Sequence, residues 1–227
     1  MATVAPEPSP LLALMRLQPG WELAAEQLRV LLNERTGRSE GVDGYAAVYA
    51  HARAAMVFDV VASHRRRYRE VVVPAVRRFR EQWPDLTLRQ LADGDADSGL
   101  GLPPERWSTI RGVATGFEHY RADRPELVSL SDDALVADWA MSVEPVRLTP
   151  RLDPYVGAVS GIGIALFAYL RMRSGADGLK PDVRVRKHLA RLGFPSPQGE
   201  AGLLLLLGEA VAEEAGISRL ELDQLLW

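Results

Sequence analysis

Residues 159–185 combine a Gly-Ile-Gly turn, an apolar run long enough for a helix, and an aspartate that follows a proline. The glycines of the turn allow positive φ and close approach of another backbone. We expect the turn amides to point outward at the start of the next helix, where they could bind a phosphate. An ordinary glycine-rich turn between two helices would have a similar sequence. The turn consists of Ser160, Gly161, Ile162 and Gly163.

Asp182 lies between Pro181 and the basic segment 183–191. An aspartate in this position commonly caps a helix, because its carboxylate accepts hydrogen bonds from the first free amides. A carboxylate can also stabilise a developing cation or orient a water molecule. Lys180, two residues earlier, is either a phosphate contact or a solvated surface charge.

The composition of the 227 residues, 47% hydrophobic and 25% charged, is that of an ordered globular protein. The absence of cysteine excludes disulfides, thiolate zinc sites, iron–sulfur clusters with cysteine ligands and thiol catalysis. A net charge of −3 makes nonspecific nucleic-acid binding less expected, but a local basic surface remains compatible with it. We expect no export signal, no membrane span and a cytoplasmic location.

The elements that must position these residues are predicted to be helices. No segment alternates apolar and polar residues over a strand length, so we expect an all-α fold. A helix is expected to end near Ala158, and a second helix should run from about Ile164 to Arg173. Further helices are predicted over residues 21–37, 45–63, 68–83, 104–120 and 132–143, with a capping box of Ser218 and Glu221 before the last helix.

Several segments occur in the order that is typical of one family. They are "FDVVASHRRRYREVVVPAVRRF", "GLPPERWSTIRGVATGF" and the Gly-hydrophobic-Gly helix followed by Asp182 and "RLGF". Together they resemble the helix–hairpin–helix DNA glycosylase superfamily, which includes endonuclease III and 3-methyladenine glycosylase, over roughly residues 45–194. The resemblance implies two helical lobes with the hairpin at the cleft between them. The implied segments are 1–44, packing with the C-terminal lobe, 45–156 as a barrel-like lobe, and 157–227 as hairpin and C-terminal lobe.

The resemblance implies that Asp182 is the catalytic carboxylate. Ala165 stands where bifunctional members carry a catalytic lysine, so strand cleavage is not expected. Ser160 replaces a common hairpin proline, and Arg184 replaces a common histidine. The segment between Leu102 and the hairpin is longer than the family pattern suggests. By analogy, hairpin carbonyls could hold a monovalent cation, and no other cofactor is expected.

Arginine-rich segments at 64–69, 77–80 and 184–191 could neutralise a DNA backbone, although arginine-rich helix faces often only meet water. The resemblance places His64, Arg65 and Arg66 in a loop that lines the cleft. Arg65 matches a residue that fills the gap left by a flipped base, and Leu102 matches an apolar wedge. Leu102 could equally be a core leucine. The implied DNA contacts are thus Ser160, Gly161, Ile162, Gly163, His64, Arg65, Arg66, Leu102, Lys180 and Arg184.

The sequence is compatible with three hypotheses about function. The first is a monofunctional DNA glycosylase of base excision repair that acts on double-stranded DNA and is associated with the nucleoid. The second is a catalytically inactive helix–hairpin–helix protein that binds DNA. The third is a helical interaction protein without a nucleic-acid role. No metal site is expected, because the histidines are scattered and "DGDADSG" at 93–99 departs from a calcium loop. No obligate protein partner is inferred.

Overall fold

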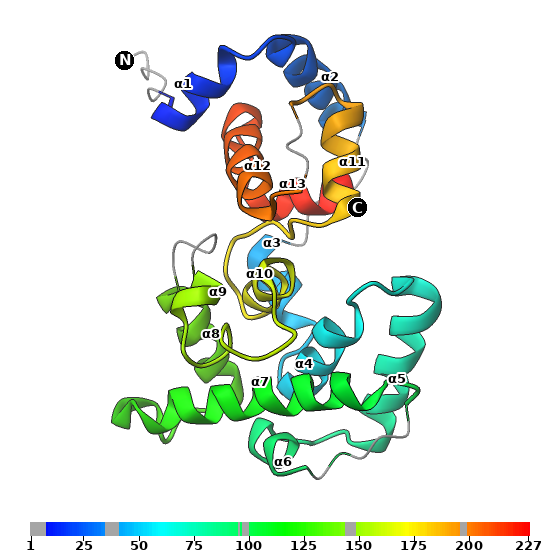
Figure 1. Cartoon of the computed structure of the whole chain (residues 1–227), viewed down its shortest axis with the longest axis vertical. Coiled ribbons are helices and arrows are strands. Elements are labelled where there is room, and N and C mark those ends of the chain that lie inside the picture. Colours follow the sequence, from blue (N-terminus) through cyan, green and yellow to red (C-terminus); the bar gives the residue numbers. More distant parts are fainter. Residues whose placement is uncertain (1–7, 35–40, 95, 97–99, 144–148, 196–198) are drawn as a thin grey trace. The chain divides into compact units, whose positions relative to one another are not determined.

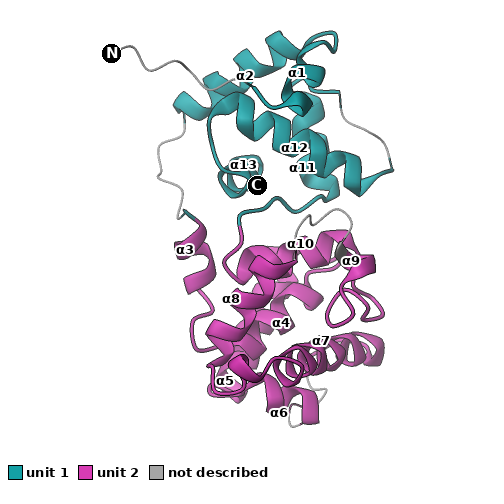
Figure 2. Ribbon diagram, turned by 90° about the vertical axis from the view of Figure 1, so that its left-hand side faces the viewer, with its two compact units in different colours: residues 1–41, 177–227 teal, residues 42–176 magenta. Residues whose placement is uncertain are grey.

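The computed structural model describes residues 8–34, 41–94, 96, 100–143, 149–195 and 199–227 (Figure 1). These residues form α-helices, one π-helical turn and one 3₁₀ turn, without a strand, so the predicted all-α fold is confirmed. None of the described helices has the length and apolarity needed to cross a membrane. The chain divides into two compact units (Figure 2). Unit 1 comprises residues 1–41 and 177–227, and unit 2 comprises residues 42–176.

Unit 1 contains α1 (Pro10–Arg16), α2 (Trp21–Glu34), α11 (Val183–Arg191), α12 (Ala201–Ala215) and α13 (Arg219–Leu226). Both N-terminal helices pack against α12. Glu214 of α12 accepts hydrogen bonds from Arg16 Nε (2.8 Å) and Trp21 Nε1 (3.1 Å), and it pairs with Arg29 (3.1 Å). Burial opposes ionisation of Glu214, but these partners outweigh it and lower the pKa of its carboxyl. The N-terminal helices are thus tied to α12 by charge as well as by packing.

Unit 2 contains the remaining helices, and α4 is the central one. It packs against α5, α7, α8 and α10, and all ten of its residues are buried, as predicted for this segment. Phe58 of α4 stacks on Phe79 of α5 with ring centroids 4.5 Å apart, and Trp107 of α7 lies 5.6 Å from Phe58. The elements are α3 (Gly41–Ala47), α4 (Arg53–Ala62), the π-helix (Tyr68–Val72), α5 (Val73–Gln82), α6 (Leu88–Asp93), α7 (Pro104–Ala122), the 3₁₀ turn (Pro125–Leu127), α8 (Asp132–Ser142), α9 (Thr149–Leu152) and α10 (Ile164–Arg173).

The helix starts predicted for α7, α8 and α13 are confirmed, whereas the helix predicted over 68–83 begins as a π-helical turn and becomes α5 at Val73. Proline stands in the first turn of α5 and of α7, where its missing N–H costs little. Ser131 caps α8 by accepting a hydrogen bond from the Ala134 amide. Ser218 and Glu221 form the predicted capping box at α13.

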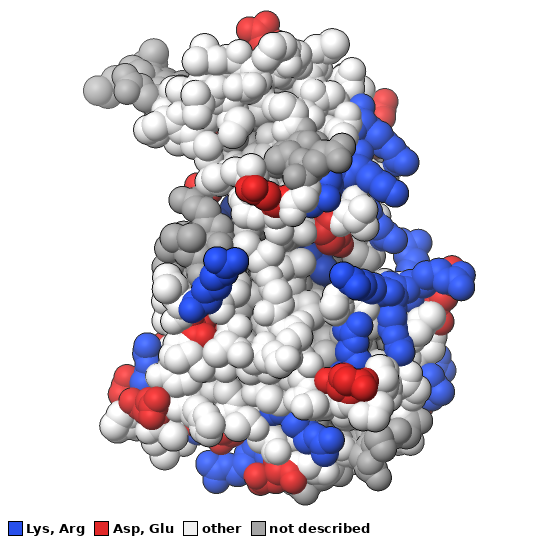
Figure 3. All heavy atoms as spheres, in the orientation of Figure 1, with Lys and Arg blue, Asp and Glu red and all other residues white. Residues whose placement is uncertain are grey.

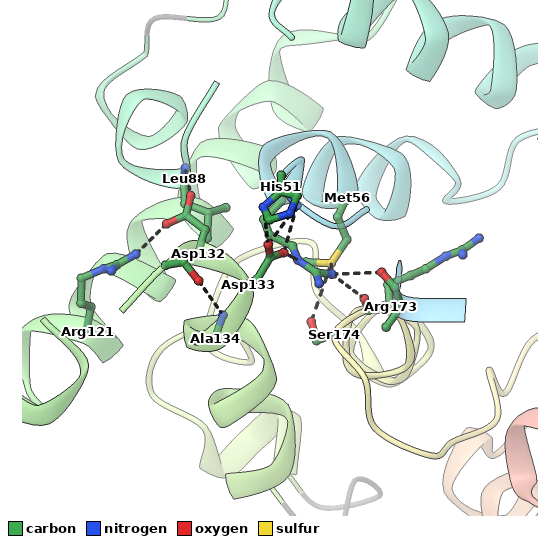
Figure 4. Close-up of polar contacts among 12 residues, drawn as sticks. His51, Met56, Leu88, Arg121, Asp132, Asp133, Ala134, Arg173 and Ser174 are labelled. Atoms are coloured by element: carbon green, nitrogen blue, oxygen red, sulfur yellow. Dashed lines mark hydrogen bonds and ion pairs between the residues drawn. The ribbon is translucent and has the colours of Figure 1, made fainter. Parts of the chain in front are cut away.

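A single helix over residues 45–63 is wrong. His51 adopts φ +59°, outside the helical region, and separates α3 from α4. Asp133 of α8 stabilises this break, since its carboxylate accepts the His51 amide (2.9 Å) and contacts His51 Nδ1 (3.1 Å) (Figure 4). The same carboxylate accepts a hydrogen bond from Arg53 Nε at the start of α4.

The helix predicted to end near Ala158 is also wrong. α9 stops at Leu152, and turns lead from there to the start of α10. The Asp153 carboxylate accepts hydrogen bonds from the amides of residues 155–157 at 2.8–3.1 Å. These bonds replace the helical ones and close a tight turn.

The boundary between the units differs from the one expected at 156/157. Residues 157–176 belong to unit 2, because α10 packs against α4 and α8. Phe167 of α10 meets Trp139 of α8 edge to face, with ring centroids 5.3 Å apart. The Gly-Ile-Gly turn is therefore part of the unit that also contains His64 and Arg65.

Candidate nucleic-acid interface

A pocket of about 630 Å³ lies on unit 2 where three segments meet. One segment contributes His64, the second is the first turn and a half of α7, and the third contributes Ser160 and Gly161. We call it the hairpin pocket. Three residues predicted to contact DNA, from positions almost 100 residues apart in the sequence, thus line one pocket. Its full lining is His64, Pro104, Glu105, Arg106, Ser108, Thr109, Ser160 and Gly161.

The turn that closes one side of the pocket has a defined backbone. Gly161 adopts φ +93°, and the Ile162 amide donates a hydrogen bond to the Val159 carbonyl (3.0 Å). Thr109 Oγ1 of α7 donates to the Ser160 carbonyl (3.0 Å), which fixes the turn against α7. Ile162 is buried, and Gly163 caps α10, which begins at Ile164 as predicted.

The two glycines of the turn should respond differently to substitution. A Cβ at Gly161 would lie 2.6 Å from Thr109 Oγ1 on a backbone with positive φ, whereas Gly163 has open space around it and an extended backbone. We expect Gly161→Ala to lower the free energy of unfolding by about 1–3 kcal/mol. Gly163→Ser should stay within about 0.5 kcal/mol of wild type, because serine is a good N-cap. Denaturant unfolding checks both values, and equal losses in the two variants would contradict the assignment.

The loop between α4 and the π-helix, residues 63–67, contributes His64 to the pocket, and we call it the arginine loop. Arg65 in this loop adopts φ +56°, which is uncommon for a residue with a side chain. Arg106 of α7 donates hydrogen bonds to the carbonyls of Val61 and His64, both at 3.2 Å. Arg66 donates to the Gly101 carbonyl (3.0 Å). Cross-links to the segment that leads into α7 therefore hold the loop in this conformation.

The arginine loop and Arg106 concentrate positive charge. Burial lowers the pKa of the Arg106 guanidinium, and the charges of Arg66 and Arg65 lower it further. The positive charges of these guanidinium groups repel one another, so a bound anion would stabilise them. Glu105 also lines the pocket, so the positive charge is not uniform. Figure 3 shows Lys and Arg side chains gathered on the side of unit 2 where α5 lies.

Arg106 is a pocket residue that the sequence did not predict. In "GLPPER" it lies in the first turn of a helix that starts at a proline, and the sequence carries no other signal for it. Its role depends on carbonyls about 45 residues earlier in the chain. Leu102, expected as an apolar wedge or a core leucine, is buried with 7% of its surface exposed.

The other predicted site residues belong to unit 1. Asp182 caps α11, as expected, because its Oδ1 accepts hydrogen bonds from the amides of Arg184 (2.8 Å) and Val185 (3.0 Å). The Arg184 guanidinium lies 4.2 Å from the ring centroid of Trp227. Lys180 is buried, so it is not the solvated surface charge that was one of the two expectations for it, and its amide donates to Asp223 Oδ1 (2.9 Å). Within unit 1, Asp182 and Arg184 thus lie at the start of α11, and Lys180 lies directly before it and is hydrogen-bonded to α13 through Asp223.

The described residues contain no group of three or more His, Asp or Glu side chains arranged to hold a metal ion. Asp95 and Asp97 of the acidic loop lie outside the described residues. Comparison with known proteins gave no match among family models, curated proteins or solved structures. A functional proposal for this chain therefore depends on the motif resemblance and on the chemistry of the hairpin pocket.

Proposed function

We propose that this chain binds double-stranded DNA through the hairpin pocket and the arginine loop of unit 2. The observation that carries the proposal is that the Gly-Ile-Gly turn, His64 and Arg106 line one pocket. The charges of Arg66 and Arg65 act on the Arg106 guanidinium from the neighbouring loop. Phosphate contacts from arginines and from backbone amides supply most of the affinity of proteins for duplex DNA. The cross-links from Arg106 reduce the freedom that the loop would lose on binding.

We further propose that the bound DNA is the substrate of a monofunctional glycosylase reaction. Cleavage of an N-glycosidic bond builds positive charge on the sugar as the base leaves, and a carboxylate can stabilise that charge. Asp182 is the candidate, by its match to the family's aspartate. Its capping hydrogen bonds both go to Oδ1, so capping is compatible with a second role for Oδ2. Ala165 lacks a nucleophile, so water would complete the reaction and leave an abasic site.

The alternative is a protein that binds duplex DNA without excising bases. The observation that favours it is the geometry of Asp182, since capping α11 is by itself a sufficient reason for an aspartate at this position. The replacement of the hairpin proline by Ser160 is compatible with either proposal. Both proposals share the same binding surface, so they differ only in whether the bound DNA loses a base.

Incubation with duplexes that carry different damaged or mispaired bases tests both proposals. We expect binding whose logarithm falls linearly with the logarithm of salt concentration, because phosphate contacts release counterions. For a glycosylase, strand breaks should appear only after hot alkali reveals abasic sites. Binding without alkali-sensitive sites on any duplex would select the alternative. If neither undamaged nor damaged duplexes show salt-dependent binding, the DNA proposal is wrong and a helical interaction protein remains.

A further inference from the structure

A buried carboxylate joins the two sides of the hairpin pocket inside unit 2. Asp59 of α4 is 0% exposed, and its Oδ2 accepts hydrogen bonds from the hydroxyls of Tyr169 (2.9 Å) and Tyr68 (3.1 Å). The two hydroxyls lie 3.3 Å apart. We call these three residues the Asp59 cluster. Arg173 also donates to the Tyr169 hydroxyl (3.3 Å), and its guanidinium lies 3.8 Å from the ring centroid of Tyr45.

The members of the Asp59 cluster come from the three elements that carry the pocket's two loops. Asp59 is one turn before the arginine loop, and Tyr68 is the first residue after it. The hydrogen bond between them therefore closes the arginine loop at its base. Tyr169 is on α10, the helix that begins directly after Gly163 of the Gly-Ile-Gly turn. One oxygen atom, Asp59 Oδ2, thus links the base of the arginine loop to α10.

Four energetically costly features lie in the arginine loop or directly beside it. Burial raises the pKa of Asp59, although the charge of Arg173 and the tyrosine hydroxyls oppose the shift. The Tyr49 hydroxyl also interacts with the Asp59 carboxylate and lowers its pKa. Oδ1 is nevertheless buried without a hydrogen-bond partner among the described residues. The positive φ of Arg65 and the π-helix that starts at Tyr68 add backbone cost.

An apolar residue in place of Asp59 would avoid the cost of burying a carboxylate. Proteins in which well-packed apolar side chains replace buried charged groups are often as stable as the originals. Local costs of this kind tend to gather where a fold serves function rather than stability. We propose that Asp59, Tyr68 and Tyr169 are positioning residues, which hold the arginine loop and the hairpin turn at the spacing needed to contact duplex DNA together. This inference rests on the proposed DNA binding at the same surface.

The test compares variants that remove one hydroxyl each from the same unit. Tyr169→Phe deletes the link to the hairpin helix. The matched control is Tyr120→Phe, because the buried Tyr120 hydroxyl hydrogen-bonds Asp138 (2.6 Å) and Ser142 (3.0 Å) and links α7 only to α8. We expect Tyr169→Phe to weaken duplex binding about tenfold and to lower the salt slope by about 1. Tyr120→Phe should bind within about twofold of wild type, whatever it costs in melting temperature.

Asp59 supplies a second test with its own rescue. Asp59→Leu removes both hydrogen bonds and should lose about as much affinity as Tyr169→Phe, whereas Asp59→Asn retains an acceptor oxygen and should bind within about threefold of wild type. Hydrogen exchange of the amides of residues 64–67 and 160–163 should accelerate in Asp59→Leu and Tyr169→Phe more than in Tyr120→Phe. A general loss of stability would not single out these amides.

The outcomes separate this inference from the proposed function. If wild-type protein shows no salt-dependent duplex binding, both fail together. If wild type binds and glutamate at Arg65 and Arg66 abolishes that binding, the interface stands. The positioning role is then overturned if Tyr169→Phe binds like wild type, or if Tyr120→Phe loses as much affinity as Tyr169→Phe.

Discussion

Replacing Arg65 and Arg66 by glutamate should weaken duplex binding by at least about 100-fold at roughly 0.1 M salt. The two guanidinium groups lie close enough to Arg106 to lower its pKa, so one double substitution replaces two positive charges beside the hairpin pocket with two negative ones. The slope of log affinity against log salt should fall by about 2, because two phosphate contacts are lost. Fluorescence anisotropy with a labelled duplex at several salt concentrations measures both quantities.

Arg77 and Arg78 offer a control with the same change of charge in the same unit. Both are exposed residues of α5, and Arg77 pairs with Glu81 at 3.1 Å. We expect glutamate at these two positions to weaken binding by less than about tenfold. Equal losses in the two double variants would mean that net charge, rather than the hairpin pocket, determines binding. Unchanged affinity in the Arg65 and Arg66 variant would remove the arginine loop from the interface.

The parts of the fold that depend on local chemistry could be predicted from the sequence. α10 begins and ends at the predicted residues, since the glycines before it and the apolar run within it are local signals. The cap at Asp182 and the capping box at Ser218 depend on residues two to three positions apart. The order of motifs predicted that the Gly-Ile-Gly turn and the arginine loop contribute to one site, but it assigned them to different lobes, whereas the structure has both in unit 2.

The features that the sequence could not predict depend on distant partners. The break at His51 is stabilised by Asp133, 82 residues later in the chain, so the local pattern favours one continuous helix. The turn before the Gly-Ile-Gly segment depends on Asp153, whose carboxylate is also a hydrogen-bond acceptor for Trp139 Nε1 of α8 (3.3 Å). In the sequence, Asp59 is a single polar residue in an apolar run. Its role depends on the hydrogen bond from Tyr169, which is 110 residues away.

Asp182→Asn should abolish base excision, by about 1,000-fold or more, while fold and duplex affinity remain near wild type. The carboxylate charge is what would stabilise the sugar cation, and an amide of the same shape cannot supply it. The cap of α11 should survive, because asparagine caps helices about as well as aspartate does. Alkali-revealed abasic sites measure excision, and anisotropy measures binding. Borohydride should trap no protein–DNA adduct in either protein, since Ala165 has no nucleophile where the resemblance would place a catalytic lysine.

The control for this last prediction is the loss of a cap without the loss of a charge. Ser218→Ala removes the side-chain cap of α13 in the same unit and should cost about 1 kcal/mol of stability while excision continues. If Asp182→Asn keeps full activity, Asp182 acts only as a cap and its catalytic assignment is wrong. A trapped adduct in wild type would instead identify a lysine nucleophile, with Lys187 as the first candidate because its side chain is exposed on α11. Either result would change the chemical assignment and leave the proposed DNA binding intact, because the arginine loop and the Gly-Ile-Gly turn contain neither residue.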